Sequence, residues 1–310
     1  MQRLRVVLAC AVLAQPSASA QSLTNGAWTY SVTNGSATIL SYGGVGGAVA
    51  IPAVLDGIPV RVIGGGGTIG IFGASNSSAT SVDISEGVTS IANYAFQRST
   101  GLARVSIPAT TTNIGDYAFA YCSALDGLVL PAALQRLGSA SFGVCSSLSY
   151  ITIPASVTNI PFAAFAYCTN LAGATIPASV TSIGDGAFNF CTRLSGVLFA
   201  GVPPVLLGTT NIFLNNTNAV YRLPEAAGWT NTYSGRPVVV FAPAAGPSAY
   251  ASPGVFQFSW TGTGAMPMNV QRRLSMDGGA WAVVSSNNSA GSFTDTNAPA
   301  DRAFYRATLP

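Results

Sequence analysis

A 23-residue repeat runs through the middle of the sequence and constrains the fold more than any other feature. One phenylalanine per unit returns at this interval, at Phe96, Phe119, Phe142, Phe165 and Phe188. Leucines keep the same step from residue 102 to residue 194, and isoleucine or leucine keeps it from residue 91 to residue 183. Neither a helix nor a strand has such a period, so each unit is predicted to be one coil of a solenoid whose equivalent side chains stack in columns.

The residues inside a unit predict a short strand followed by a helical turn. Apolar residues alternate toward Ile107 as in a strand, and Pro108 ends the run. Phe119 and Cys122 are three residues apart, the spacing of one helical turn with both side chains facing inward. Because one coil cannot bury these residues alone, neighbouring coils are expected to stack about 4.8 Å apart and to pair their strands in parallel.

These units resemble the BspA-type (type 5) bacterial leucine-rich repeat, of which residues 171–193 are a full example. The resemblance is close over residues 79–199 and implies a mainly β fold, a leucine-rich-repeat solenoid that binds other molecules. Some positions depart from the repeat pattern: Ser85, Ser99, Pro161-Phe162 and Ala174. We expect these departures to weaken packing locally without disturbing the phase of the repeat.

The residues before the repeats predict a leader and a cap. Residues 1–20 combine arginines, a short apolar run and Ala18-Ser19-Ala20, which is typical of a signal peptide and indicates a secreted or cell-surface protein. Residues 21–78 are expected to form a hairpin, turning at Asn34-Gly35, and a capping coil that shields the first open edge of the solenoid.

The residues after the repeats predict a second, smaller domain. The solenoid with its terminal cap coil is expected to fill residues 79–242, and the Ala-, Pro- and Ser-rich residues 243–254 predict a linker. Residues 255–310 contain strand-length segments separated by turn residues, which predicts a small β-sandwich-like domain. This end resembles C-terminal β-modules that are distantly similar to fibronectin type III.

The composition excludes many catalytic mechanisms. The sequence has no lysine and no histidine, so a Ser-His-Asp triad, an imidazole metal ligand and a lysine Schiff base are all ruled out. A net charge of +3 gives no basic field for nucleic acid. Asp116 and Asp185 share a column three coils apart, about 14 Å by stacking, which is too far for a glycosidase pair and suits turn caps instead. We expect no catalytic residues, no cofactor and no metal.

Four cysteines form one column of the repeat, at Cys122, Cys145, Cys168 and Cys191. Buried free thiols that act as small apolar side chains are the favoured interpretation, because stacked side chains point in parallel. Disulfides between neighbouring coils are the alternative, since strand spacing falls within the permitted Cα separation. A zinc site is disfavoured because its ligands must converge tetrahedrally.

Two outward-facing columns are candidates for contact with a partner. On the turn side, Tyr121, Tyr167 and Phe190 precede the cysteines and either form an aromatic binding stripe or pack along the outer wall. On the strand side, Arg104 and Tyr150 are of the residue types that anchor interfaces.

The sequence therefore predicts a monomeric, secreted or surface-displayed, non-enzymatic scaffold for adhesion or protein binding. Its partner is expected to be an extracellular protein or a glycan, and the mature chain has no transmembrane segment. A structural role in an extracellular layer is one alternative. A carbohydrate-binding accessory protein is another, using the turn-side aromatics or Trp260 and Trp281.

Overall fold

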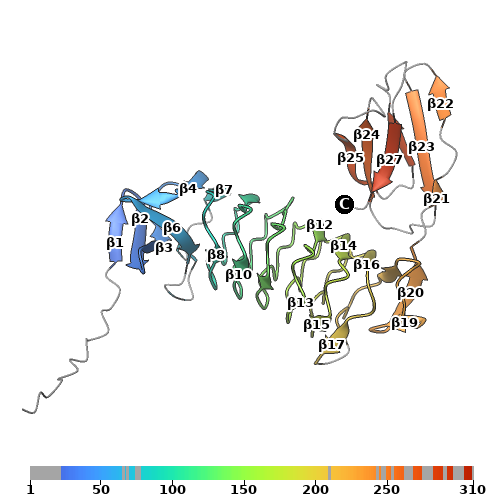
Figure 1. Cartoon of the computed structure of the whole chain (residues 1–310), viewed down its shortest axis with the longest axis horizontal. Helices are drawn as coiled ribbons and strands as arrows, with labels where there is room; N and C mark the ends of the chain where they lie inside the picture. Colours follow the sequence, from blue (N-terminus) through green and yellow to red (C-terminus); the bar gives the residue numbers. More distant parts are fainter. Residues whose placement is uncertain are drawn as a thin grey trace, which may run out of the picture.

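The computed structural model describes residues 22–64, 67, 70–73, 78–208 and 211–241, and the backbone of strands between residues 244 and 308. The predicted signal peptide, residues 1–20, lies outside the described residues. Figure 1 shows the repeat region as a solenoid of stacked coils. We number the repeat units by residue: coil 1 (79–101), coil 2 (102–124), coil 3 (125–147), coil 4 (148–170) and coil 5 (171–193).

Parallel strands form two walls of the solenoid. The strand wall consists of β4 (Gly47–Ile51), β7 (Ala79–Ile84) and β9 (Arg104–Ser106), followed in a separate sheet by β12 (Tyr150–Thr152), β14 (Gly173–Ile176), β16 (Gly196–Phe199), β18 (Ala219–Arg222) and β20 (Arg236–Val240). The return wall consists of β6 (Ile58–Ile63), β8 (Ser90–Ile91), β10 (Asn113–Ile114) and β11 (Arg136–Leu137), then β13 (Asn159–Ile160), β15 (Ser182–Gly184) and β17 (Val205–Leu207). Within coils 1 to 5 paired residues are one repeat apart, as in Ser81 with Arg104, which confirms the predicted parallel stacking.

The third wall, which we name the turn wall, differs from the prediction. The described residues contain no helix, and the segment with Phe119 and Cys122 is a run of turns in which Tyr117 and Tyr121 have φ angles of 55° and 64°. The amides of Tyr117, Phe119 and Tyr121 donate to carbonyl oxygens of coil 3 at 2.9, 2.7 and 2.8 Å. The amides between them bond within the coil, as Ala120 does to the Tyr117 carbonyl at 3.1 Å. Left-handed residues thus turn every second amide toward the next coil, which a helical turn cannot do.

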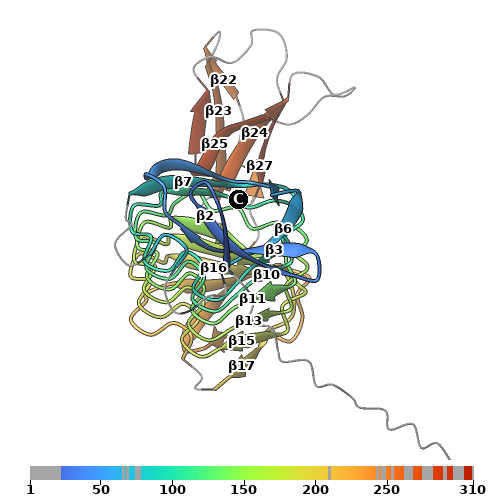
Figure 2. The same cartoon turned by 90° about the vertical axis from the view of Figure 1, so that its left-hand side faces the viewer.

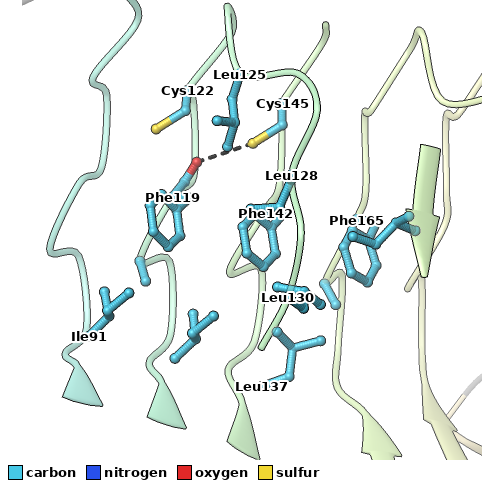
Figure 3. Packing of buried hydrophobic residues seen from close by; sticks show 14 of the residues in the cluster. Ile91, Phe119, Cys122, Leu125, Leu128, Leu130, Leu137, Phe142, Cys145 and Phe165 are labelled. Atoms are coloured by element: carbon cyan, nitrogen blue, oxygen red, sulfur yellow. Dashed lines mark hydrogen bonds between the residues drawn. The ribbon is translucent and has the colours of Figure 1, made fainter. Parts of the chain in front are cut away.

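The phenylalanine column is a continuous stack in the core, as predicted. Ring centroids of successive coils lie 5.0 Å apart for Phe96 and Phe119, 5.2 Å for Phe119 and Phe142, and 5.6 Å for Phe142 and Phe165. All of these side chains are fully buried, and Figure 3 shows three of them in file. The stack continues through Phe188 to Phe213 in the terminal coil.

The four cysteines of the repeat lie beside this stack as free, buried thiols. Each thiol donates to the carbonyl of the phenylalanine in the preceding coil, as Cys145 does to Phe119 at 3.2 Å (Figure 3). The same bond recurs from Cys122 to Phe96, from Cys168 to Phe142 and from Cys191 to Phe165. The column therefore forms a ladder of thiol-to-carbonyl bonds rather than disulfides.

Antiparallel strands close the N-terminal end of the solenoid. β1 (Ser22–Asn25), β2 (Trp28–Thr33) and β3 (Ser36–Tyr42) form a meander, and Asn34 and Gly35 take the positive φ angles of a type I′ turn, as predicted. β3 pairs in parallel with β6, which itself pairs with β5 (Val54–Leu55). Figure 2 shows β2 and β3 lying across the open end of the coils.

Aromatic side chains close the other end. The Trp229 indole donates to the Gly201 carbonyl at 2.9 Å, and the Tyr233 hydroxyl donates to the Pro204 carbonyl at 2.8 Å. Both rings pack on Phe199, with centroids 5.1 and 5.5 Å away. The strand β19 (Thr232–Tyr233) then turns back along β20 in antiparallel pairing.

The strands after residue 243 pair in two antiparallel sheets. One sheet contains β21 (Ala244–Ala245), β22 (Ala249–Ser252), β23 (Val255–Thr261) and β26 (Ser292–Asp295); the other contains β24 (Met268–Arg273), β25 (Ala282–Asn288) and β27 (Phe304–Thr308). Because β21 and β22 pair with β23, the residues that we predicted to be a linker contribute strands to this sheet. The likeness to fibronectin type III stays a prediction.

The sheet of the strand wall is interrupted at coil 3, and the sheet of the return wall is interrupted between coils 3 and 4. On the strand wall, coil 3 has no strand between β9 and β12, and Gly127 there has a φ of 64°. The Asp126 carboxylate replaces the missing backbone acceptor, taking bonds from the Ser149 amide at 3.2 Å and the Ser149 hydroxyl at 2.6 Å. In the other coils this bond is made by backbone, as from the Ala172 amide to the Ser149 carbonyl.

On the return wall, β11 and β13 are not paired. Pro161 has no amide to donate at the position where Gly115 bonds the preceding coil at 2.8 Å. The turn wall continues across the same junction, because Phe142 and Val144 donate to carbonyls of coil 4 at 2.9 and 2.8 Å. The departure at Pro161 thus weakens one wall while the phase of the repeat is kept, as expected.

Candidate binding surfaces

The two predicted anchors of the strand wall have different environments. Arg104 is exposed on β9, whereas Tyr150 on β12 is only 8% exposed. The Tyr150 hydroxyl bonds to the Thr175 hydroxyl, and burial raises the Tyr150 pKa to about 12. Tyr150 therefore does not offer the exposed anchor that we expected, because its ring packs against its own sheet.

A hollow of about 700 Å³ lies around Arg104 on the strand wall. Its floor comes from β4, β7 and β9, and Asp126 and Gly127 close it on the side where coil 3 lacks a strand. Asp83 also lines this hollow, so it carries acidic groups and one arginine. Val129 nearby is 77% exposed and lines an adjoining apolar hollow of about 510 Å³.

The turn wall exposes large aromatic side chains. Tyr121 and Tyr167 are 44% and 47% exposed, and Phe162 is 54% exposed. Phe190 is half-buried because its ring stacks on Tyr167, with centroids 4.5 Å apart and planes 3° from parallel. Of the predicted stripe, the structure therefore pairs Tyr167 with Phe190 and leaves Tyr121 two coils away.

Small side chains of coil 3 leave a slot between these aromatics. Val144 stands in the column of Tyr121 and Tyr167, and Ala140 stands in the column of Tyr117. The resulting slot has a volume of about 260 Å³; we name it the ring slot, and its lining includes Tyr117, Tyr121, Val144, Phe162 and Tyr167. The slot was not predicted from the sequence, although the sequence carries two signals of it: Phe162 in place of a polar residue, and the aliphatic Val144 inside an aromatic column.

Arg98 occupies the end of the aromatic column in coil 1. Its guanidinium lies 5.7 Å from the centroid of the Tyr121 ring, on the side away from the slot. This contact is within the range of a cation–π interaction. Tyr121 is therefore supported on its coil 1 side and open on its coil 3 side.

The Asp116 carboxylate on the turn wall acts between coils. Asp116 accepts a bond from the Ser139 amide of the next coil at 2.9 Å and forms an ion pair with Arg136 at 3.4 Å. We expected it to cap its own turn, but its bond joins two coils. Asn93 makes the equivalent bond one coil earlier, to the Asp116 amide at 2.8 Å.

The thiols are not placed for chemistry. Burial raises the pKa of Cys122 and Cys191 to about 12 and raises those of Cys145 and Cys168 well above the ordinary value. A protonated thiol is a poor nucleophile and a poor metal ligand. Within the described part of the chain, no group of three His, Cys, Asp or Glu side chains converges as a metal site requires, and no helix has the length and apolar character of a membrane span.

Comparison with known proteins identifies the repeats. Residues 68–195 match the family model for the BspA type leucine rich repeat region, in six copies. A leucine rich repeat protein of T. pallidum is 28% identical with a TM-score of 0.53, over 62% of this chain and 89% of that one. No curated protein matches the sequence.

A leucine rich cell surface protein of Faecalibacterium prausnitzii A2-165 has the same fold, with 23% identity and a TM-score of 0.50. The match covers 88% of this chain and 63% of that protein, so this chain spans less than two thirds of its relative. The 23-residue period, the stacked phenylalanines and the family match agree. The repeat units within residues 68–195 therefore match the BspA type leucine rich repeat.

Proposed function

We propose that this protein is a secreted or cell-surface scaffold that binds another extracellular protein through its solenoid and has no enzymatic activity. The observation that carries the proposal is the exposure of Tyr121, Phe162 and Tyr167 on the turn wall. Because these side chains are exposed, small or polar residues at the same positions would leave the core unchanged. Large aromatic side chains are the residue type that contributes most to protein interfaces.

The context of the repeats supports this proposal. Repeat solenoids present extended rigid surfaces, and leucine-rich repeat proteins are in general binding rather than catalytic proteins. The F. prausnitzii relative is described as a cell surface protein, and the first residues of this chain have the pattern of a signal peptide. Adhesion is the finer role that we assign on these grounds.

The test is an array of extracellular matrix proteins and glycans probed with the full chain. We expect saturable binding to a protein, lost in the double variant Tyr121→Ala/Tyr167→Ala and retained in Arg104→Ala. Both variants change exposed side chains and leave the phenylalanine stack intact, so circular dichroism should be unchanged. Loss in Arg104→Ala instead would move the binding site to the strand wall.

Two other outcomes would contradict the proposal. Binding to glycans alone would support the carbohydrate-binding alternative. No binding to any component would support a structural role in an extracellular layer.

A further inference from the structure

We propose that the ring slot holds one neutral aromatic side chain of a protein partner, inserted between the rings of Tyr121 and Tyr167. This inference rests on the proposed function and names the chemistry that the partner must present. It comes from a ring that is missing in an otherwise regular aromatic column.

The spacing of the column leaves room for one ring. Tyr121 and Tyr167 belong to coils 2 and 4, so their backbones are about 10 Å apart, twice the spacing of neighbouring strands. Within this wall, rings of adjacent coils stack 4.5 Å apart at Tyr167 and Phe190 and 5.4 Å apart at Tyr94 and Tyr117. A ring midway between Tyr121 and Tyr167 would therefore meet both at an ordinary stacking distance.

The size of the slot also fits a single side chain. Its volume of about 260 Å³ lies below the range of roughly 300–1,000 Å³ that is usual for small-molecule sites. Val144 forms its floor, and Phe162 adds a further exposed apolar surface at its edge.

The chemistry of the lining selects a neutral, apolar occupant. The lining residues carry no charge, and apart from that of Phe162 their backbone amides already donate hydrogen bonds within the turn wall. The Tyr121 amide bonds to Gly143 at 2.8 Å, the Val144 amide to Ala166 at 2.8 Å, and the Tyr167 amide to Asn189 at 2.7 Å. The polar groups left for an occupant are carbonyl lone pairs, the Phe162 amide and the tyrosine hydroxyls, which can donate or accept.

A slot with few polar groups favours an aromatic side chain over a sugar. A pyranose ring carries several hydroxyls, each of which loses water in the slot and needs a replacement partner. A Phe or Trp side chain stacks with the same area and has few or no polar atoms to satisfy. The observations therefore favour a protein partner over a glycan.

The test uses the full chain and N-acetyl-tryptophanamide, titrated by saturation-transfer NMR. Matched probes are N-acetyl-leucinamide, which is apolar without a ring, and methyl β-glucopyranoside, which is a ring with hydroxyls. We expect saturable binding of the tryptophan probe and none of the other two. Val144→Tyr, which supplies the chain's own ring, should abolish binding, whereas Arg104→Ala on the strand wall should leave it unchanged.

A second variant keeps the test independent of how well Val144→Tyr folds. Tyr121→Ala removes one of the two stacking faces and should weaken the affinity for the tryptophan probe about threefold to tenfold. Unchanged affinity in either slot variant, stronger binding of the glucoside, or no saturable binding of the tryptophan probe would each overturn the inference. Protein binding on the array that survives Val144→Tyr would overturn the ring slot alone and leave the proposed function standing.

Discussion

At the scale of single residues, Val144 is the one aliphatic side chain in the column that contains Tyr121 and Tyr167. Like Tyr121 and Tyr167, it has a left-handed backbone, with a φ of 63°. A β-branched side chain is strained in that conformation, and valine adds no ring to the column. The small side chain that opens the ring slot is therefore also a local weakness in the fold.

We predict that Val144→Tyr stabilises the protein. The new ring would stack between Tyr121 and Tyr167, and the free energy of unfolding should rise by about 0.5–1.5 kcal/mol. Urea unfolding at pH 7 measures the change. Val144→Ala, which has no ring, is the control and should not reproduce the gain; a lower midpoint for the tyrosine variant would show that the column has no room for a ring.

The thiol column predicts a loss of stability in alkali. Burial keeps the pKa of Cys122 and Cys191 at about 12, against an ordinary value of 9.0. Above pH 9 the unfolded chain releases protons that the folded chain retains, so stability falls as pH rises toward 12. The slope is at most about 1.4 kcal/mol per pH unit for each thiol.

Urea unfolding at pH 7, 9 and 10.5 tests this prediction. Cys145→Ala should make the decline less steep, because one buried ionisable group is removed. In a chain without residues 1–20, we expect a thiol reagent to modify four cysteines after unfolding and none before it. Reaction of the folded protein, or fewer than four reactive thiols in denaturant, would contradict the buried free column.

At the scale of elements, Asp126 maintains the strand wall where coil 3 has no strand. Its carboxylate accepts both bonds from Ser149 that the backbone of coil 3 does not supply. We predict that Asp126→Ala lowers the free energy of unfolding by about 1 kcal/mol, whereas Asp126→Asn, which keeps an acceptor oxygen, costs less. Thermal unfolding compares the three proteins, and equal loss in both variants would mean that charge rather than the hydrogen bond matters.

Periodicity predicted those elements whose residues repeat in kind. The phenylalanine and cysteine columns, the parallel pairing and the Asn34-Gly35 turn all follow from residue identity and spacing. The conformation of the turn wall could not be predicted in this way, because the spacing of hydrophobic residues does not depend on the sign of φ at a residue such as Tyr117. The one hint is Gly186, which occupies the position equivalent to Tyr117 in coil 5.

The candidate site was only partly predictable for a similar reason. Exposure of Tyr121 and Tyr167 follows from an outward column. Burial of Tyr150 does not, because it depends on how its ring packs against neighbouring coils rather than on which way its position faces. The ring slot depends on a difference between coils, and the repeat pattern contains only what the coils have in common.

At the scale of the whole molecule, the repeat predicts that coils can be removed in whole units. Deleting residues 171–193 joins Asn170 to Leu194 in phase and brings equivalent columns back into line. We expect the shortened chain to fold with a lower unfolding midpoint, because solenoid stability is roughly the sum of coil and interface contributions. Deleting residues 171–182 alone breaks the phase of the repeat and should prevent folding. Circular dichroism and thermal unfolding compare the two shortened chains. The same unfolding midpoint in both would contradict the stacking of equivalent positions.

The interrupted sheets make the connections between coils unequal along the solenoid. Two of its three rows of backbone bonds stop at coil 3, and the turn wall carries the backbone bonds from coil 3 to coil 4. The gap between Tyr121 and Tyr167 spans the same joint. A side chain bound in the ring slot would therefore contact the wall whose backbone bonds are continuous, and not either of the interrupted walls.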